Sequence, residues 1–174
     1  MPTYAAFLRG VSPLNAKMSE LKQCLETAGF GHVATVLGSG NVVFDSRSAS
    51  RESLERKIEA AMKKSLDRVF ATTVRSVAEL TALRDSDPYK PFELPPRAKR
   101  VVTLLHEKPK SRIQLPIELD DAQILCVKGT EIFSAYVPSA KGPVFMNLIE
   151  KTFGKDLTTR TWDTIGKVVK AGGG

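Results

Sequence analysis

The stretch that decides the fold is HVATVLGSGNVVFD, residues 32–45. His32 to Leu37 and Asn41 to Asp45 are short runs typical of β-strands, and Gly38-Ser39-Gly40 joins them. Glycine adopts positive φ without steric cost, so this connection is typical of a tight turn between paired strands. The stretch therefore predicts a β-hairpin. The other elements of the first half are predicted from the residues on either side of it.

Apolar residues around the hairpin recur at strand or helix spacing. They predict four more elements: a strand at 4–8, a helix at 18–28, a helix capped by Ser50 with apolar positions to Leu66, and a strand at 71–74. Ser76 and Glu79 have the spacing of a capping box, which predicts a short helix reaching Leu83.

Prolines interrupt the pattern at Pro88, Pro91 and Pro95-Pro96. Because proline cannot continue a helix or a strand ladder, these residues indicate a connection between two subdomains. The predicted organisation is an N-terminal subdomain 1–87, a Pro-rich connection 88–98, a C-terminal subdomain 99–171 and a frayed Gly tail 172–174.

The second half repeats the order of elements without repeating the residues. It predicts strands at 100–105, 122–127, 131–137 and 158–160, helices at 143–153 and 161–169, and a proline-containing connection at 108–121. A β-α-β-β-α-β order is the split βαβ, or ferredoxin-like, pattern. The predicted fold class is α+β, with two similar ferredoxin-like (βαββαβ) subdomains in a pseudo-duplicated arrangement. Whether their sheets join stays open.

Composition narrows the class of protein. The chain has 174 residues with 26 basic and 19 acidic side chains, which gives a formal charge of +7. No apolar run approaches the roughly 20 residues of a membrane-spanning helix, and the first residues form a strand pattern rather than a signal peptide. Cys24 and Cys126 are too few for a disulfide scaffold. We expect a cytoplasmic protein.

Basic charge is concentrated in the second half. Its densest patch is interrupted only by Glu107 and consists of Arg97, Lys99, Arg100, Lys108, Lys110 and Arg112. Such a patch permits contact with nucleic acid or another polyanion, and it is equally compatible with an ordinary solvated surface.

A candidate anion site follows from strand order. In a split βαβ unit the third strand lies between the first two, so the end of the first strand meets the start of the third. That edge collects glycines, cations and a helix N-terminus, which together suit phosphate. Its candidate ligand-binding residues are Arg9, Gly10, Lys17, Ser39, Gly40 and Asn41. The alternative is that the glycines only form turns and Asn41 only ties the hairpin.

A second candidate locus contains Arg160 and Trp162, between a strand end and a helix start. Thr161 is suited to cap that helix, and Asp163 suits its positive first turn. Arg160 is a possible phosphate ligand, whereas a lone tryptophan is also a common core residue.

Motifs for several functions are missing. Ser39 and Asn41 occupy the positions where an RNA-recognition sheet carries stacking aromatics, so that mode of binding is excluded. The sequence has no Walker loop, nucleophile elbow or metal-ligand spacing around His32 and His106. We nominate no catalytic residue, metal or cofactor.

Several segments together resemble the DUF1697 family, a bacterial family of unknown function. They are Tyr4 to Gly10, Lys17-Met18, Gly29-Phe30, Ser39 to Phe44, and Thr159 to Thr164 with Lys167. The resemblance implies two similar α+β subdomains and supplies no activity. Family members often continue Arg-Gly with Ile-Asn-Val-Gly-Gly, whereas this chain has Val11-Ser-Pro-Leu-Asn15, a stiffer loop.

Three functions remain as hypotheses. The first is binding of a phosphate-bearing or other anionic small ligand at the edge that contains Arg9. The second is binding of nucleic acid or another polyanion through residues 97–112. The third is an enzyme whose site is assembled from several loops.

Overall fold

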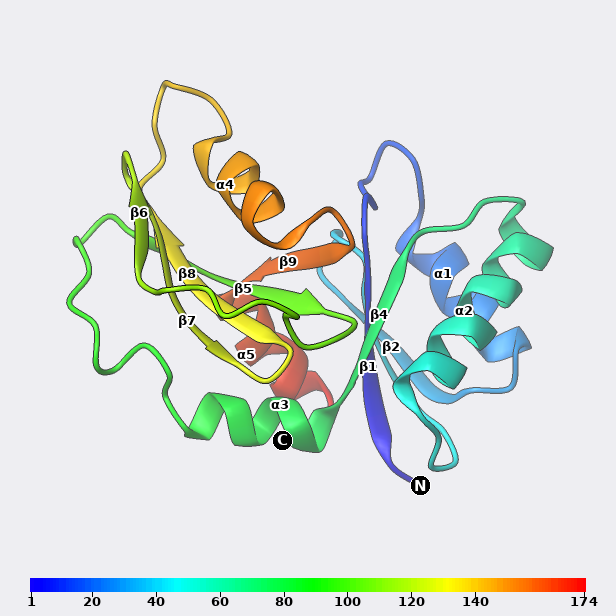
Figure 1. Cartoon of the computed structure of the whole chain (residues 1–174). Coiled ribbons are helices and arrows are strands. Elements are labelled where there is room, and N and C mark those ends of the chain that lie inside the picture. Colours follow the sequence, from blue (N-terminus) through cyan, green and yellow to red (C-terminus); the bar gives the residue numbers. More distant parts are fainter. The chain divides into compact units, whose positions relative to one another are not determined.

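The computed structural model describes residues 1–174 and contains five helices and two antiparallel sheets (Figure 1). The chain forms two compact units. Unit 1 comprises Met1–Asp85 and Ile165–Gly174, and unit 2 comprises Ser86–Thr164. None of the helices combines the length and apolar character required to cross a membrane. The mixed α and β architecture predicted from the sequence is confirmed.

The sheet of unit 1 has the order β2-β3-β1-β4. Its strands are β1 (Thr3–Leu8), β2 (Gly31–Val36), β3 (Asn41–Asp45) and β4 (Thr72–Ser76). β2 and β3 form the predicted hairpin, with Val36 opposite Asn41. β3 also pairs antiparallel with β1, where Ala5 lies opposite Val43. The third strand therefore lies between the first two, as the split βαβ order requires.

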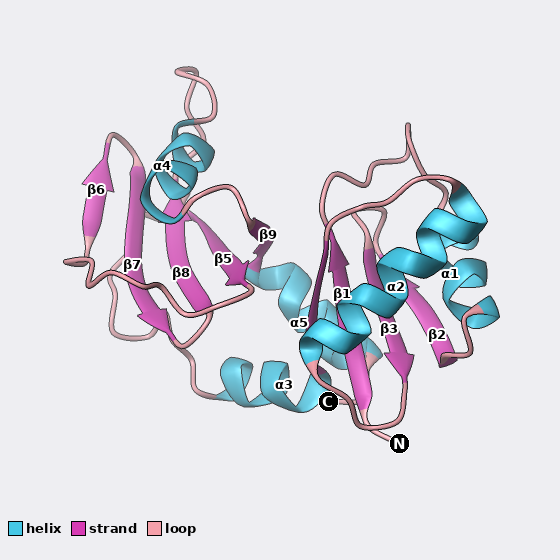
Figure 2. Ribbon diagram, turned by 45° about the vertical axis from the view of Figure 1, so that its right-hand side comes forward, coloured by secondary structure: helices cyan, strands magenta, loops and turns pink.

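Two helices cover one face of this sheet, α1 (Met18–Thr27) and α2 (Arg51–Leu66) (Figure 2). Their apolar faces, including Leu21, Leu25 and Ile58, pack on Phe44 and other strand residues. The predicted cap of α2 is confirmed, because the Ser53 amide donates to Ser50 Oγ at 3.2 Å.

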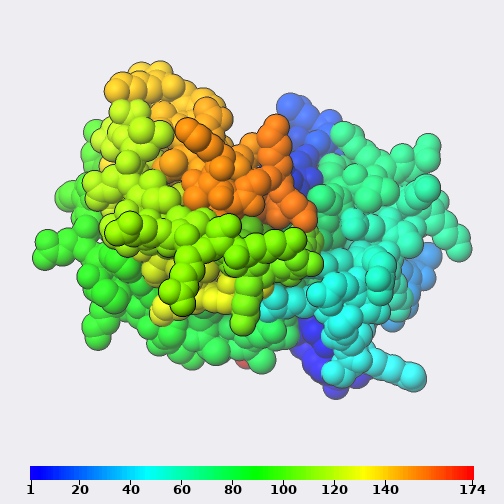
Figure 3. Space-filling model, viewed as in Figure 1, coloured from blue at the N-terminus to red at the C-terminus, as the bar shows by residue number.

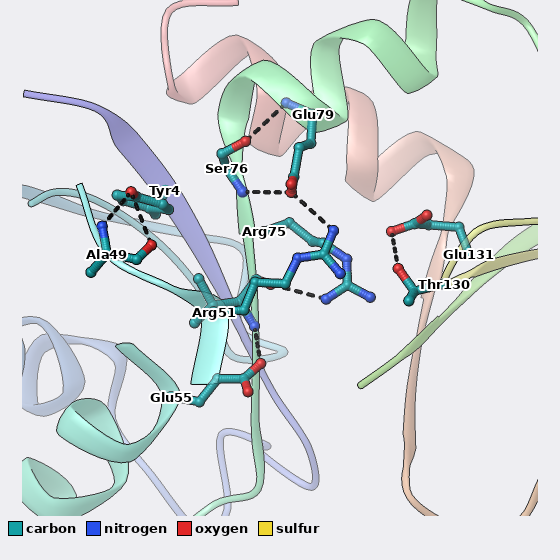
Figure 4. A network of polar contacts seen from close by, with 10 residues as sticks. Tyr4, Ala49, Arg51, Glu55, Arg75, Ser76, Glu79, Thr130 and Glu131 are labelled. Carbon is teal, nitrogen blue, oxygen red and sulfur yellow. Dashed lines mark hydrogen bonds and ion pairs between the residues drawn. The ribbon is translucent and has the colours of Figure 1, made fainter. Parts of the chain in front are cut away.

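The capping box of α3 (Val77–Asp85) is present in both directions (Figure 4). The Glu79 amide donates to Ser76 Oγ at 3.0 Å, and the Ser76 amide donates to Glu79 Oε2 at 3.1 Å. Glu79 Oε2 also lies 3.2 Å from Arg51 Nη2 at the start of α2. One carboxylate thus fixes the beginnings of two helices.

The C-terminal helix α5 (Trp162–Ala171) departs from the predicted division of the chain. From Ile165 onward it groups with unit 1, whereas the sequence placed it with residues 99–171. The Gly tail is not frayed. The Gly172 amide donates to the Val168 carbonyl at 3.0 Å, and a Cβ at Gly172 would lie 2.6 Å from Val77 Cγ2. Absence of a side chain lets the tail pack closely against α3.

Unit 2 has a sheet of order β6-β7-β8-β5-β9. Its elements are β5 (Lys99–Leu105), β6 (Ile117–Leu119), β7 (Ala122–Lys128), β8 (Glu131–Tyr136), α4 (Val144–Phe153) and β9 (Leu157–Thr161). Phe145, Leu148 and Ile149 of α4 pack on the sheet. Gly154 follows the helix at φ +87°, as the predicted stop requires.

The region between β5 and β7 differs from a complete βαββαβ order. It contains the short strand β6, which was not predicted, and no helix. Pro109 and Pro116 interrupt this segment, and it has no apolar repeat at helix spacing. The long connection instead runs over the surface of unit 2 before β6 joins the sheet edge.

Tyr89 anchors the Pro-rich connection to unit 2. Its side chain is buried, and its hydroxyl lies 2.8 Å from the Val101 carbonyl oxygen and 2.9 Å from that of Ser134. Burial raises the pKa of Tyr89 well above its ordinary value, so the phenol remains a proton donor at physiological pH. Its ring contacts Phe133 and Trp162 at centroid distances of 5.7 and 5.5 Å.

Tyr89→Phe is expected to lower the free energy of unfolding by about 1–2 kcal/mol, because two buried carbonyls lose their shared donor. Tyr136→Phe is the matched control, since that ring stacks on Phe145 and should retain the stacking. Urea denaturation measures both variants. Equal stability of Tyr89→Phe and the unchanged protein would contradict the anchoring role.

Candidate functional site

The predicted edge of unit 1 is brought together as strand order requires. The Leu8 amide at the end of β1 donates to the Gly40 carbonyl at 2.8 Å. Gly40 has φ +88°, and a Cβ there would lie 2.9 Å from Val11 Cβ. Both the conformation and the close approach require glycine. The loop after β1 and the β2–β3 turn therefore form one continuous surface.

The loop that follows Gly10 is closed by its own hydrogen bonds. Asn15 Nδ2 donates to the Gly10 carbonyl at 2.7 Å, and the Ser12 amide donates to Asn15 Oδ1 at 2.9 Å. Arg68 Nη1 donates to the Asn15 carbonyl at 3.1 Å. The polar groups of Ser12 and Asn15 are thus used to shape the loop.

Asn41 has a structural task in the hairpin. It is fully buried, and Nδ2 donates to the Val36 carbonyl at 2.9 Å and to Ser39 Oγ at 3.0 Å. The amide nitrogen has two protons, and both have partners within the hairpin. A direct role of Asn41 toward a ligand remains a prediction.

Three cations surround this loop end. Arg9 is half-buried, with its amide donating to the Ala71 carbonyl at 2.9 Å, and Lys17 is exposed at the start of α1. Arg68 is the third, with its guanidinium carbon 5.1 Å from the centre of the Phe70 ring. The sequence did not nominate Arg68, because only folding brings it to Asn15.

Arg160 and Trp162 lie in unit 2, not with the six other candidates in unit 1. Trp162 is half-buried, and its ring packs edge-on against Phe133 at 6.0 Å and against Tyr89 at 5.5 Å. Arg160 Nη1 donates to the Thr159 carbonyl at 2.8 Å, and burial lowers the pKa of Arg160 to about 10. The predicted cap is confirmed, since the Thr164 amide donates to Thr161 Oγ1 at 3.2 Å.

Arg75 is a buried cation that no sequence pattern marked. It lies on β4 opposite Ala5, is fully buried, and donates from Nη1 to the Val74 carbonyl at 2.9 Å (Figure 4). The Val74 amide donates to Glu55 Oε2 at 2.8 Å, which joins α2 to the same strand. This network supports the sheet.

A cavity of about 410 Å³ lies in unit 2, within the basic patch. We call it the basic groove, and it is lined by residues 105–111, Ile113, Thr152, Phe153 and Asp156. The β5–β6 connection that contributes most of the wall lies on the molecular surface, yellow-green in Figure 3. Lys108 and Lys110 line the groove, while the other cations of the patch do not.

His106 forms the inner polar contact of the basic groove. Its Nε2 lies 3.3 Å from Asp156 Oδ1, and the aspartate side chain is 84% exposed. The hydroxyl groups of Ser111 and Thr152 and the carboxylate of Glu107 complete the polar lining. The structure contains no cluster of three or more side chains suited to hold a metal ion.

This architecture defines an α and β protein built from two antiparallel sheets, with cations gathered where the first strand of each sheet ends. The chain belongs to the family described as "Protein of unknown function (DUF1697)", which matches residues 1–133. A solved structure of the conserved bacterial protein SP0830 from Streptococcus pneumoniae is similar, with a TM-score of 0.73 and 21% identity over 100% of this chain and 99% of that one. At that identity the likeness shows the fold alone. Comparison with curated proteins gives no match.

Asn41→Ala is expected to lower the free energy of unfolding by about 1–3 kcal/mol, because it removes two donors from a buried turn. Lys17→Ala provides the control, since Lys17 is exposed and makes no capping hydrogen bond. Thermal and urea denaturation measure the difference. If Asn41→Ala were as stable as Lys17→Ala, the hairpin-tying role would be wrong.

Proposed function

We propose that the chain binds a phosphate-bearing or other anionic small ligand, and that the basic groove of unit 2 is the binding site. The carrying observation is that Lys108 and Lys110 line one cavity together with His106. The same lining contains the carboxylates of Glu107 and Asp156, so the support comes from the positions of the two lysines and not from the net charge of the groove. Ser111 supplies a neutral hydroxyl donor that suits phosphate or carboxylate oxygens, whereas Thr152 Oγ1 already donates to the Leu148 carbonyl at 2.8 Å.

Topology supports this location. In unit 1 the Leu8 amide at the end of the first strand donates to Gly40 in the turn before the third. In unit 2 the Leu105 amide donates to the Thr130 carbonyl at 2.9 Å, also between the end of the first strand and the turn before β8. The groove begins at Leu105, so it occupies the edge of unit 2 that corresponds to the edge of unit 1 where strand order predicted an anion site.

The corresponding end of unit 1 is a second candidate location. Arg9, Lys17 and Arg68 surround it, and Gly10, Ser39, Gly40 and Asn41 shape its loops. Much of the polar backbone at this end of unit 1 already has hydrogen-bond partners within the loop. Ligand binding there would therefore depend on the cationic side chains. Arg160 and Trp162 remain a further candidate locus.

Polyanion binding through residues 97–112 is the alternative function, supported by the same lysines. The two ligand classes differ in salt dependence, because a polyanion releases condensed counter-ions on binding.

We further infer that the two units are ferredoxin-like copies joined by residues 88–98, supported by the shared order of β2-β3-β1-β4 and β7-β8-β5-β9. Free Cys24 and Cys126 support a cytoplasmic location.

Replacing both Lys108 and Lys110 with Ala is expected to weaken binding of inorganic phosphate about tenfold or more, since a tenfold loss corresponds to about 1.4 kcal/mol. Isothermal titration with phosphate at two salt concentrations measures this effect. Lys63→Ala combined with Lys64→Ala on α2 is the matched control, because it removes the same charge from unit 1.

Unchanged phosphate affinity in the Lys108/Lys110 double variant would contradict the groove as the site. Loss of binding in Arg9→Ala instead would move the site to unit 1. Binding only to oligonucleotides, with affinity falling steeply as salt rises, would favour the polyanion alternative.

A further inference from the structure

A second cavity, of about 580 Å³, adjoins the basic groove. The two share five lining residues: Lys108, Pro109, Ser111, Ile113 and Phe153. We call the second cavity the apolar chamber, and its remaining lining is Leu115, Leu125, Cys126, Val127 and Gly129. The two cavities are therefore neighbouring compartments that share part of one wall, and the residues found only in the second carry no charge.

The fold builds the apolar chamber from three elements. Phe153 is the last residue of α4, and Leu115 lies in the connection, two residues before the start of β6. Leu125 to Val127 belong to β7, whose pairing with β8 shifts between Ile124 and Cys126. A β-bulge re-aims the side chains beside it, and here it lies at the chamber wall.

We propose that the basic groove and the apolar chamber together bind one amphipathic organic anion. The anionic head lies near Lys108 and Lys110, and an acyl or alkyl body lies against Leu115, Val127 and Phe153. This inference rests on the proposed function, because the head occupies the same groove. Charge complementarity selects the head, and the apolar wall selects the body.

The lining argues against a nucleotide as occupant. Base binding without sequence preference relies on stacking against aromatic side chains, and Phe153 is the only Phe, Tyr or Trp that lines either compartment. Most of the other side chains of the chamber wall are aliphatic, and the exceptions are Lys108, Ser111 and the thiol of Cys126. Aliphatic walls reward each buried methylene of a flexible chain, whereas they give a flat base no partner ring.

Chain length is the sharpest test. Orthophosphate, ethyl phosphate, butyl phosphate and hexyl phosphate share a head and differ in the apolar body. The affinity of the protein for these phosphates is expected to rise about fourfold for each added methylene until the chamber is filled. Leu115→Ala should reduce this increment while leaving orthophosphate affinity unchanged. The Lys108/Lys110 double variant should weaken all four ligands by a similar factor.

Cys126 provides an independent readout in the unmodified protein. It is half-buried in the chamber, whereas Cys24 is 2% exposed in unit 1. Hexyl phosphate should slow alkylation of Cys126 by iodoacetamide, and orthophosphate should not. The alkylation rate of Cys24, followed by mass spectrometry in the same sample, should not change.

The possible failures are distinguishable. Suppose that orthophosphate binds in the groove, and that hexyl phosphate binds with the same affinity and leaves Cys126 unprotected. The amphipathic inference is then overturned, while the proposed function stands. If none of the four phosphates binds, both are overturned. A chain-length increment that persists in Leu115→Ala, with Cys126 unprotected, would place the alkyl body outside the chamber and overturn the inference.

Discussion

The structure depends on one backbone constraint that both units obey: the first strand pairs antiparallel with the second strand of a hairpin, β1 with β3 in unit 1 and β5 with β8 in unit 2. In unit 1 it brings Leu8 to Gly40 at 2.8 Å, and in unit 2 it brings Leu105 to Thr130 at 2.9 Å. Each bond links a strand end to a hairpin turn distant in sequence. The segment that follows the first strand in each unit therefore begins beside that turn.

The two units use this position differently. After Leu8 the chain makes a short loop that Asn15 closes and Arg68 holds from the α2–β4 connection. After Leu105 the chain continues through a proline-containing connection that never becomes a helix. The first loop is filled by its own hydrogen bonds, whereas the second leaves a cavity lined by lysines. The two units differ here because the side chains of Asn15 and Arg68 close the first loop. Strand order does not cause the difference.

Local chemistry made much of the fold predictable. The Gly38-Ser39-Gly40 turn, the Ser50 cap and the Ser76–Glu79 capping box depend on neighbouring residues, and all three are present. The misses depend on distant partners. Nothing local marks β6 as an edge strand, joins Gly172 to Val77, or brings Arg68 to Asn15. The patch containing Lys108 was visible in the sequence, but the cavity beneath it required the end of α4.

The chemistry of the groove and chamber favours holding a ligand over attacking one. Burial raises the pKa of Cys126, so its thiol stays protonated at neutral pH and is a poor nucleophile. The polar partner of His106 is Asp156, an exposed carboxylate at the surface. These two side chains are not arranged as an acid and a base on either side of a reacting atom. Lys108 and Lys110 are the cations of the groove lining and are the groups proposed to contact an anion. Two lysines beside a largely aliphatic wall and a half-buried thiol therefore support the proposal that this site selects an anion by its head and its length.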